Sequence, residues 1–334
     1  MNGDAVLVTG ASGFIGGHVA RWLHAEGIPV LATGRNRTAL AQLERDGIRC
    51  VDADLACDPL DPLLCGVKRI VHAAALSTPW GPRDAFIRAN VTATERLLQA
   101  AARQGITHVV HLGSPSIYFR PQDQLQLDEC FQPPTRWITH YAESKWLSEE
   151  VVRHACSASV MTGVILRPRA VFGAGDAAIF PRIVQRAGKG RFPLVNGGRA
   201  IIDITAVENV VQAVWRALQS APTDDVPALN ISNGEPLPVK TILDRLFDAL
   251  GMRVQYRNVP RGLGMALAGV MEGIAKALPG QPEPPVSRYT LGVLAYSQTL
   301  DIAAARWHLG YQPTLGVLEG IDRFAQQWRA HARA

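Results

Sequence analysis

Short apolar runs alternate with amphipathic stretches along the first half of the chain. The run Ala5 to Thr9 is mostly apolar, and after Gly16 the apolar residues Val19 and Leu23 are four positions apart. A short apolar run is typical of a buried strand, and a spacing of three to four residues is typical of an amphipathic helix. Their alternation predicts a parallel sheet covered by helices on both faces. We expect its strands at Ala5 to Thr9, Pro29 to Thr33, Ile48 to Asp52, Arg69 to Ala73, Thr107 to Leu112 and Met161 to Arg167.

A glycine-rich turn joins the first predicted strand to the first predicted helix. Gly10 permits a tight turn, Gly13 lets the backbone approach a pyrophosphate, and Gly16 lets helix and strand pack closely. The diphosphate would then lie at the helix N-terminus, where free N–H groups and the helix dipole favour an anion. A tight turn without a ligand is the alternative, which we disfavour because strand, turn and helix follow in the order that a dinucleotide site requires.

The strand and helix pattern extends into the C-terminal half. Asp203 to Ala217 and Leu229 to Ile231 have the pattern of returns to the sheet. We therefore expect an α/β fold, a doubly wound parallel sheet (Rossmann) with a smaller interleaved C-terminal substrate lobe. The predicted dinucleotide-binding domain covers residues 1–170 with returns near 201–232, and the substrate lobe covers residues 171–200 and 233–334.

One apolar stretch, Gly262 to Leu278, is broken only by Glu272 and Lys276. It is too short and too interrupted for a transmembrane span. Three interpretations remain open: a core helix, a wall of an apolar substrate pocket, or a helix that makes peripheral contact with a membrane surface. We favour the first two. The turn-rich segment Pro279 to Pro285 is expected to form a flexible lid.

Composition narrows the class of protein. Hydrophobic residues make up 47% of the chain and charged residues 19%, which is typical of a soluble enzyme with a substantial core. The net charge is +5, but the basic residues are scattered, so nucleic-acid binding is disfavoured. The five cysteines form no Cys-x-x-Cys pair and no zinc-type cluster, so no metal site is expected. Their odd number and the lack of a leader peptide favour reduced thiols in a cytoplasmic protein.

The choice of cofactor is indicated at the end of the second predicted strand. A site for NAD places an acidic residue there, whereas a site for NADP offers an arginine to the additional phosphate. The residues after Thr33 include Arg35 and Arg37 but no carboxylate. We therefore expect NADP (NADPH), with NAD less favoured, and Arg35 as the phosphate-binding residue. Arg37 is a second candidate, with a solvated surface arginine as its alternative.

Tyr141 and Lys145 stand four positions apart. On a helix these positions share a face, so the phenol and the ammonium can point into one cleft. The pKa of a free tyrosine is about 10, and a neighbouring cation favours the phenolate. We therefore expect Lys145 to lower the pKa of Tyr141, and Tyr141 to donate a proton in ketone reduction or accept one in alcohol oxidation. An ordinary amphipathic helix that carries both residues is the alternative.

Two serines follow the fifth predicted strand. Ser114 is expected to polarise a substrate carbonyl by hydrogen bonding, and Ser116 is the less favoured candidate for this role. Because Pro115 lies between them, both serines could instead serve a turn.

Together these motifs resemble the extended short-chain dehydrogenase/reductase family in order and spacing. The resemblance covers almost the whole chain and is strongest to the 3β-hydroxysteroid dehydrogenase-like branch, which includes reductases of hydrophobic ketones and β-keto acids. It depends on the glycine turn, Asp54-Leu55, His72-Ala73-Ala74-Ala75, Asn90-Val91-Thr92-Ala93-Thr94, Ser114, Tyr141-x-x-x-Lys145 and Arg167-Pro168, with weaker support from Arg288-Tyr289-Thr290-Leu291, Ser297 to Asp301 and Leu309 to Pro313.

The resemblance implies roles for further residues. Ser114 lies four residues before Tyr118, as the serine of the family does, and Asp54 and Leu55 are similar to the pair that contacts adenine. Asn90 is similar to the asparagine that supports the lysine, with an exposed helical amide as the alternative. A homodimer through the helices that contain Asn90 and Tyr141 is also implied. The implied cofactor-binding residues are Gly10, Ser12, Gly13, Phe14, Ile15, Gly16, Arg35, Asp54, Leu55, Ala73, Ala74, Ala75, Asn90, Tyr141, Lys145, Pro168 and Val171.

Three functions remain open. The leading hypothesis is an NADP-dependent oxidoreductase that transfers a hydride between nicotinamide and a hydrophobic ketone or secondary alcohol, such as a sterol-like or β-keto acyl compound. A nucleotide-sugar epimerase or dehydratase with tightly bound NAD is disfavoured by the missing acidic residue after Thr33. A non-catalytic dinucleotide-sensing protein is disfavoured because Ser114, Tyr141 and Lys145 are all present.

Overall fold

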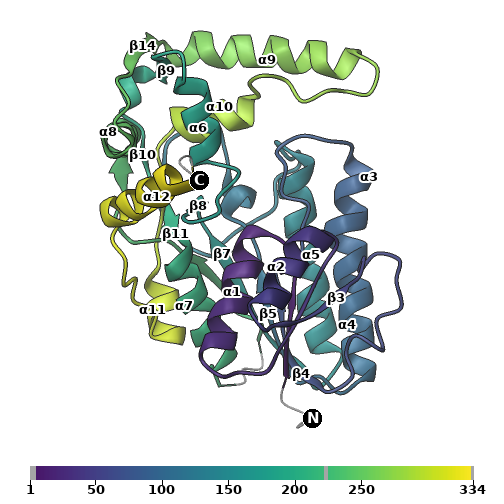
Figure 1. Cartoon of the computed structure of the whole chain (residues 1–334). Coiled ribbons are helices and arrows are strands. Elements are labelled where there is room, and N and C mark those ends of the chain that lie inside the picture. Colours follow the sequence, from purple (N-terminus) through teal and green to yellow (C-terminus); the bar gives the residue numbers. More distant parts are fainter. Residues whose placement is uncertain (1–4, 222–224, 332–334) are drawn as a thin grey trace.

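A seven-stranded parallel sheet forms the centre of the structure (Figure 1), a computed structural model that describes residues 5–221 and 225–331. The order of its strands is β12-β7-β5-β4-β1-β2-β3, and every neighbouring pair is parallel. This order confirms the predicted doubly wound sheet. The first predicted strand has the predicted ends, and each of the other five occurs with one or both ends shifted by one or two residues. The strands are β1 Ala5–Thr9, β2 Val30–Gly34, β3 Arg49–Asp52, β4 Val67–His72, β5 His108–Leu112, β7 Thr162–Pro168 and β12 Ala228–Ile231.

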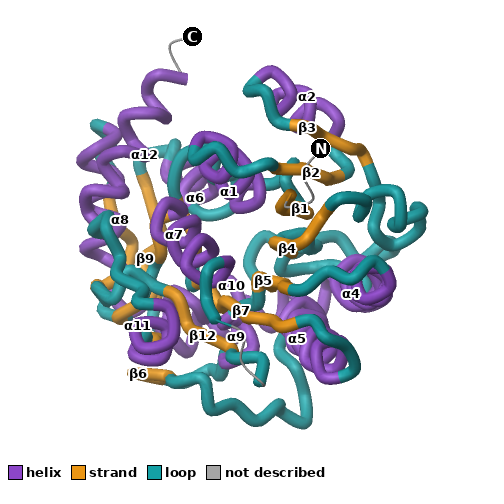
Figure 2. Tube along the Cα trace, turned by 90° about the horizontal axis from the view of Figure 1, so that it is seen from below, coloured by secondary structure: helices purple, strands orange, loops and turns teal. Residues whose placement is uncertain are grey.

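Helices cover both faces of this sheet (Figure 2). Side chains alternate between the faces along a strand, so Val6 and Val8 of β1 pack in one core and Leu7 packs in the other. The first core is closed by α1 (Phe14–Ala25), α2 (Arg37–Arg45), α7 (Val207–Leu218) and α11 (Ala303–Leu309). The second is closed by α4 (Ala93–Arg103) and α5 (His140–Ser157), and α4 follows the short helix α3 (Arg83–Phe86) and a π-helical turn, Ile87–Thr92.

A second group of elements lies beyond the carboxyl ends of the central strands (Figure 1). Its core contains Phe172, Phe180, Phe192 and Phe247. Its helices are α6 (Phe180–Ala187), α8 (Val239–Leu250) and α12 (Val317–His331). Its smaller sheets contain β6 (Gln124–Leu127), β8 (Val171–Phe172), β9 (Arg191–Val195), β10 (Ile201–Ile202), β11 (Thr205–Ala206), β13 (Leu237–Pro238), β14 (Gln255–Val259) and β15 (Gln298–Leu300), and two 3-10 turns cover Pro115–Tyr118 and Asn196–Gly198.

The expected division into domains stays a prediction. β12 returns to the edge of the sheet after α7, as expected for Leu229 to Ile231. The chain also returns a second time, because Ile302, Ala305 and Tyr311 pack in the same core as α1 and α7. That return lies within the part assigned to the substrate lobe, residues 233–334.

The apolar stretch at 262–278 forms α9 (Arg261–Ala277), which packs against α10 (Arg288–Ala295). Its buried face carries the small residues Gly264, Ala268 and Ala275 together with Glu272, whose carboxylate pairs with Arg288. A second face is apolar and exposed, so the expectation of a core helix is wrong. That face carries Leu263, Leu267, Val270, Met271, Ile274 and, just after the helix, Leu278. Among the described residues, no helix is both long and apolar enough to cross a membrane.

Candidate active site

Ser114, Tyr141 and Lys145 come together at the carboxyl edge of the central sheet. Ser114 follows β5 and caps the 3-10 turn Pro115–Tyr118. Tyr141 and Lys145 lie in the first two turns of α5, which begins after Thr139, whose hydroxyl accepts a hydrogen bond from the Ala142 N–H. The Ser114 hydroxyl is close enough to form a hydrogen bond with the phenol of Tyr141, and this contact lowers the pKa of Tyr141, which burial raises. The structure therefore joins residues that are 27 positions apart in the sequence.

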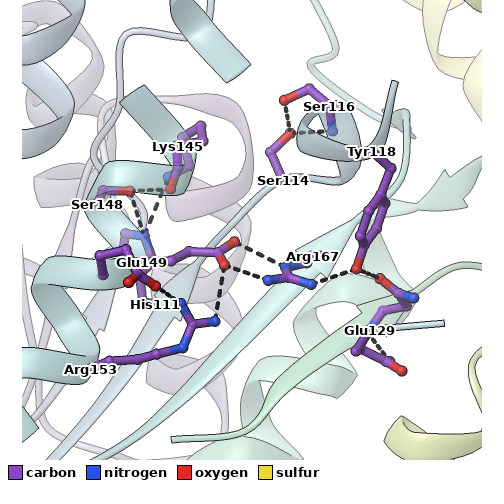
Figure 3. A network of polar contacts seen from close by, with 12 residues as sticks. His111, Ser114, Ser116, Tyr118, Glu129, Lys145, Ser148, Glu149, Arg153 and Arg167 are labelled. Atoms are coloured by element: carbon purple, nitrogen blue, oxygen red, sulfur yellow. Dashed lines mark hydrogen bonds and ion pairs between the residues drawn. The ribbon is translucent and has the colours of Figure 1, made fainter. Parts of the chain in front are cut away.

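The side chain of Lys145 is buried and lies beside His111 of β5 (Figure 3). Its Nζ donates a hydrogen bond to the Leu112 carbonyl oxygen at 2.6 Å and lies 3.5 Å from Nε2 of His111. Burial lowers the pKa of Lys145 to about 8, although Glu149 opposes this change. A buried ammonium whose pKa approaches neutrality can change its charge within the physiological pH range.

Tyr141 departs from the sequence-based expectation. Burial raises its pKa to about 12, the hydrogen bond from Ser114 opposes the rise, and the phenol of Tyr289 adds to it. The expected lowering of the phenol pKa by Lys145 is absent in this structure, because the ammonium is directed at Leu112 and His111 instead. Tyr141 is accordingly held as a neutral phenol, which is the form that can donate a proton.

Ser114 and Ser116 are hydrogen-bonded to each other within the turn that the sequence left open as an alternative. The Ser114 Oγ donates to the Ser116 Oγ at 2.9 Å, and the Ser116 N–H donates to the Ser114 Oγ at 3.2 Å. Ser114 therefore serves the turn and still faces Tyr141. Tyr118 points away from this pair, because its hydroxyl lies 2.5 Å from Nη1 of Arg167 and donates to Oδ1 of Asn230 at 2.8 Å.

The glycine turn fits a diphosphate. Gly10 has a φ of +65°, and a Cβ there would lie 2.6 Å from the Ala74 N atom, so a side chain has no room. A Cβ on Gly16 would lie 2.4 Å from the Gly10 carbonyl oxygen. Helix α1 has Gly13 as its N-cap, with no capping side chain and no acidic residue in its first turn. Its terminal N–H groups are therefore free to bind an anion.

The small residues after β4 lie against this turn. Ala73 and Ala74 are half-buried, Ala75 is exposed, and the Ala74 N–H donates to the Thr9 hydroxyl at 3.2 Å. The same hydroxyl lies 2.7 Å from Nδ1 of His72, whose Nε2 lies 2.8 Å from the Thr94 hydroxyl. His72 is therefore part of the support beneath the turn.

A cavity of about 250 Å³ lies near the end of β2. Arg35, Asp54 and Arg88 supply its charged side chains, and a carboxylate oxygen of Asp54 lies 3.8 Å from Arg35 and 4.0 Å from Arg88. The other expected residues lie apart from it: Leu55 is buried in the core, and Arg37 is bound to Asp52 at 2.5 Å. The cavity can hold one end of a dinucleotide between two guanidinium groups.

Asn90 is buried, so the alternative of an exposed helical amide is wrong. Its Oδ1 accepts a hydrogen bond from the Leu76 N–H at 2.6 Å. Its Nδ2 donates to the Leu76 carbonyl oxygen at 3.1 Å and to the Ser144 hydroxyl at 2.9 Å. Asn90 therefore joins the segment after β4 to α5, beside Lys145 but without a hydrogen bond to it. The remaining cofactor-binding candidates follow the same strand edge: Ser12, Phe14 and Ile15 at the start of α1, Pro168 at the end of β7, and Val171 in β8.

Four candidates around Tyr141, Lys145 and the cavity were missed by the sequence reasoning. His111 precedes Ser114 and contacts Lys145, and Arg88 lies two residues before Asn90. Tyr289 interacts electrostatically with Tyr141, and Glu149 forms a buried ion pair with Arg167. Glu149 could have been found from the sequence, because it stands four positions after Lys145 and so shares its helix face. Within residues 5–221 and 225–331, no group of three or more potential metal-ligating side chains occurs.

Comparisons with known proteins show the family of this chain. Residues 6–232 match the model of the NAD dependent epimerase/dehydratase family. The chain is 32% identical to 2-alkyl-3-oxoalkanoate reductase from Stenotrophomonas maltophilia, over 95% of this chain and 97% of the relative. It is 26% identical to human sterol-4-alpha-carboxylate 3-dehydrogenase, decarboxylating, over 96% of this chain and 87% of that protein.

A solved structure shows the same fold. MoeE5 in complex with UDP-glucose and NAD superimposes with a TM-score of 0.78 at 23% identity, over 98% of this chain and 99% of that chain. Family model, relatives and fold thus agree with the resemblance found in the sequence. The chain belongs to the NAD dependent epimerase/dehydratase family of extended short-chain dehydrogenases/reductases, and within it to the 3β-hydroxysteroid dehydrogenase-like branch of NAD(P)-dependent oxidoreductases.

Proposed function

We propose that the protein is an NADP-dependent oxidoreductase that reduces a hydrophobic ketone. In the reverse direction it oxidises the corresponding secondary alcohol. The convergence of Ser114, Tyr141 and Lys145 beside the glycine turn carries this proposal. Fold alone would not support it, because the same fold hosts unrelated reactions.

The side chains divide the proton chemistry between them. When bound, the reduced nicotinamide supplies the hydride that the carbonyl carbon receives. Ser114 turns its hydroxyl from the Ser116 oxygen, donates a hydrogen bond to the carbonyl oxygen and stabilises the charge that develops there. Tyr141 then gives its proton to that oxygen, and it is protonated across the physiological range because its pKa is about 12. Lys145 binds the nicotinamide ribose. To do so, its ammonium turns away from the Leu112 carbonyl oxygen, to which it donates in this structure.

The preference for NADP depends on the end of β2. Gly34 is followed by Arg35, and Arg88 reaches the same cavity from the π-helical turn. Two guanidinium groups around one pocket favour a ligand with an additional phosphate. Asp54 lies between them and is available for hydroxyl or amino groups of the adenosine part.

Aromatic side chains beside the catalytic phenol support an apolar substrate. The ring of Phe86 lies 6.4 Å from that of Tyr141, and the rings of Phe119 and Tyr289 lie 5.3 Å apart. The named relatives act on an oxoalkanoate and a sterol carboxylate. We propose a substrate of related kind, either a β-keto acyl or a sterol-like compound.

The test follows NADPH consumption with hydrophobic ketones. We expect Tyr141→Phe to lower kcat by at least about 10³-fold while NADPH still binds. Tyr256→Phe is the matched control because Tyr256 lies in β14 and bonds Asp244, and it should retain full activity. If Tyr141→Phe reduced ketones at the rate of the unchanged protein, the proposal would be wrong. Co-purified NAD without net NADPH consumption would instead support an epimerase.

Association with other molecules is a separate proposal. The family resemblance implies a homodimer, and the exposed apolar face of α9 would suit peripheral contact with a membrane surface. Light scattering tests the first, and sedimentation with lipid vesicles tests the second. A monomer in scattering, or a protein that stays in the supernatant, would contradict the respective proposal. We also propose a cytoplasmic location, which fractionation of the producing cells tests.

A further inference from the structure

Arg169 is a buried arginine without an ion-pair partner. It follows β7 directly and is 5% exposed. Its Nε atom is fully enclosed and has no hydrogen-bond partner. Across residues 5–221 and 225–331, the guanidinium forms no ion pair within 4.0 Å. An arginine keeps its charge in proteins, so this position holds a cation in the interior with no carboxylate in ion-pair contact.

The contrast with Arg167, two residues earlier, is direct. Arg167 is also buried, but its guanidinium donates twice to Glu149 and once to the Tyr118 hydroxyl. Buried charges in proteins are ordinarily paired in this manner. Arg169 therefore needs an anion that the described part of the chain does not supply at hydrogen-bonding distance.

The backbone of Arg169 is fixed on both sides. Its N–H donates to the Ile231 carbonyl at 2.9 Å, and its carbonyl accepts from the Thr205 hydroxyl at 2.5 Å. The next residue, Ala170, has a φ of +43°, which is uncommon for a residue with a side chain. Such conformations concentrate at ligand sites, where the surrounding structure maintains them. The backbone from which the guanidinium extends is therefore held in one place.

Tyr289 connects this guanidinium to the proposed catalytic residues. Its phenol interacts electrostatically with Arg169 and also with Tyr141. Its hydroxyl makes no hydrogen bond to any other described residue, and its ring packs against Phe119. Ser114 and Arg169 also follow the neighbouring strands β5 and β7, in which Leu112 lies opposite Leu166. Arg169 and the proposed catalytic residues therefore lie at the same part of the sheet edge.

Among the residues that the structure describes, Asp203 is the one carboxylate that influences Arg169 electrostatically. Its Oδ2 accepts from the Leu300 N–H at 2.8 Å, and its Oδ1 is buried without a hydrogen-bond partner. No contact between Asp203 and Arg169 reaches ion-pair distance. The carboxylate therefore remains near the guanidinium without binding it.

We propose that Arg169 binds the carboxylate of the substrate, which is a 3-oxo acid whose keto group lies between Ser114 and Tyr141. This assignment rests on the proposed reductase function and adds the substrate class to it. A guanidinium presents paired donors that match a carboxylate. The phosphates of the dinucleotide have separate binding groups at α1 and at Arg35 and Arg88. In the reaction the keto carbon gains the hydride, the keto oxygen gains the Tyr141 proton, and the carboxylate stays unchanged.

The experiment compares an acid with its neutral ester. NADPH oxidation is followed with 3-oxodecanoate and with methyl 3-oxodecanoate. We expect Arg169→Gln to lower kcat/KM for the acid by about 100-fold, mainly through KM, and to change the value for the ester by less than about threefold. Arg169→Lys should retain an intermediate preference for the acid. The matched control is Arg323→Gln, because Arg323 is exposed on α12 and pairs only with Glu319 there.

The outcomes separate this inference from the function on which it rests. Equal losses for acid and ester in Arg169→Gln would overturn the inference, since they would indicate a structural role, and so would an unchanged value for the acid. If the unchanged protein oxidised NADPH with neither compound, the reductase function would fail. Calorimetric titration with 3-hydroxydecanoate and its methyl ester would then decide the role of Arg169. Tighter binding of the acid that is lost in Arg169→Gln supports the anion site, and equal binding overturns it.

Discussion

Glu149 and Arg167 form a two-point ion pair in the interior, between helix α5 and the end of strand β7 (Figure 3). Nε of Arg167 lies 3.0 Å from one carboxylate oxygen, and Nη2 lies 2.6 Å from the other. Both side chains are almost completely buried. Because α5 carries Tyr141 and Lys145, this pair fixes the helix with the proposed catalytic residues against the strand that leads to Pro168 and Arg169.

Loss of this pair should destabilise the protein strongly. Glu149→Gln leaves the Arg167 charge buried without its counterion, so we expect the free energy of unfolding to fall by about 3 to 5 kcal/mol. Urea denaturation measures this change. Glu150→Gln is the control on the same helix, since Glu150 is half exposed and pairs with Arg153, and it should cost less than about 1 kcal/mol. Similar effects of both substitutions would contradict the assigned importance of the buried pair.

Stability should fall in mild acid because of His72. Burial lowers the pKa of His72 to about 3, and Lys145 adds to this effect. Between pH 6.5 and 3 the unfolded chain therefore binds a proton that the folded chain does not, and the free energy of unfolding decreases as the pH falls. The full difference corresponds to roughly 5 kcal/mol. Burial also lowers the pKa of His111, so His111 likewise makes the free energy of unfolding fall as the pH falls.

Denaturation midpoints between pH 7 and pH 4.5 test this expectation. His72→Gln should reduce the dependence on pH, whereas His24→Gln should leave it unchanged because His24 is exposed. A midpoint that stays constant over this range in the unchanged protein would show that His72 is not held neutral.

Activity should decline in alkali through Lys145. Since burial lowers the pKa of Lys145 to about 8, its ammonium is lost above that pH and no longer binds the ribose. The value of kcat/KM for NADPH, which reports groups of the free enzyme, should therefore fall about tenfold per pH unit well above pH 8. Tyr141 does not contribute to this decline, because its pKa is about 12.

A substitution that keeps the charge distinguishes Lys145 from other groups. Lys145→Arg should lower the maximal activity but remove the decline between pH 8 and pH 10, because a guanidinium stays protonated there. A profile of the unchanged protein that stays level to pH 9.5 would argue against Lys145 as the titrating group.

Cofactor preference should depend on Arg35 and Arg88 but not on Arg37. We expect Arg35→Asp to weaken NADPH binding by about 10- to 100-fold and to improve NADH binding, because the new carboxylate repels the phosphate and accepts from ribose hydroxyls. Arg88→Gln should weaken NADPH binding to a smaller extent. Fluorescence titration of both cofactors measures these changes.

Arg37→Gln is the matched control for this experiment. Arg37 is bound to Asp52 and lies outside the residues that line the cavity. The NADPH affinity of the Arg37→Gln variant should therefore stay within about twofold of that of the unchanged protein. If Arg37→Gln weakened NADPH binding more than Arg35→Asp did, the phosphate would lie beside Arg37 and not in the cavity with Arg35 and Arg88.

The sequence by itself determined the fold and the first members of the site. Alternation of apolar runs and amphipathic stretches predicted six of the strands and the parallel sheet, because strands buried on both faces must be apolar throughout. Gly10, Tyr141 and Lys145 were found for a similar reason, since tight turns and i to i+4 pairs are local features. The division into domains and the individual cofactor contacts remain predictions.

Only the tertiary structure decided the electrostatics and the exposure of α9. The pKa of Tyr141 depends on burial and on Tyr289, and the direction of the Lys145 ammonium depends on Leu112 and His111, all from other segments. The apolar composition of α9 does not reveal that its small residues face α10 while its large ones are exposed. Arg169 looked like any other scattered arginine, and its significance follows from burial without a paired anion. Burial and charge pairing are sums over residues distant in sequence, so no local pattern contains them.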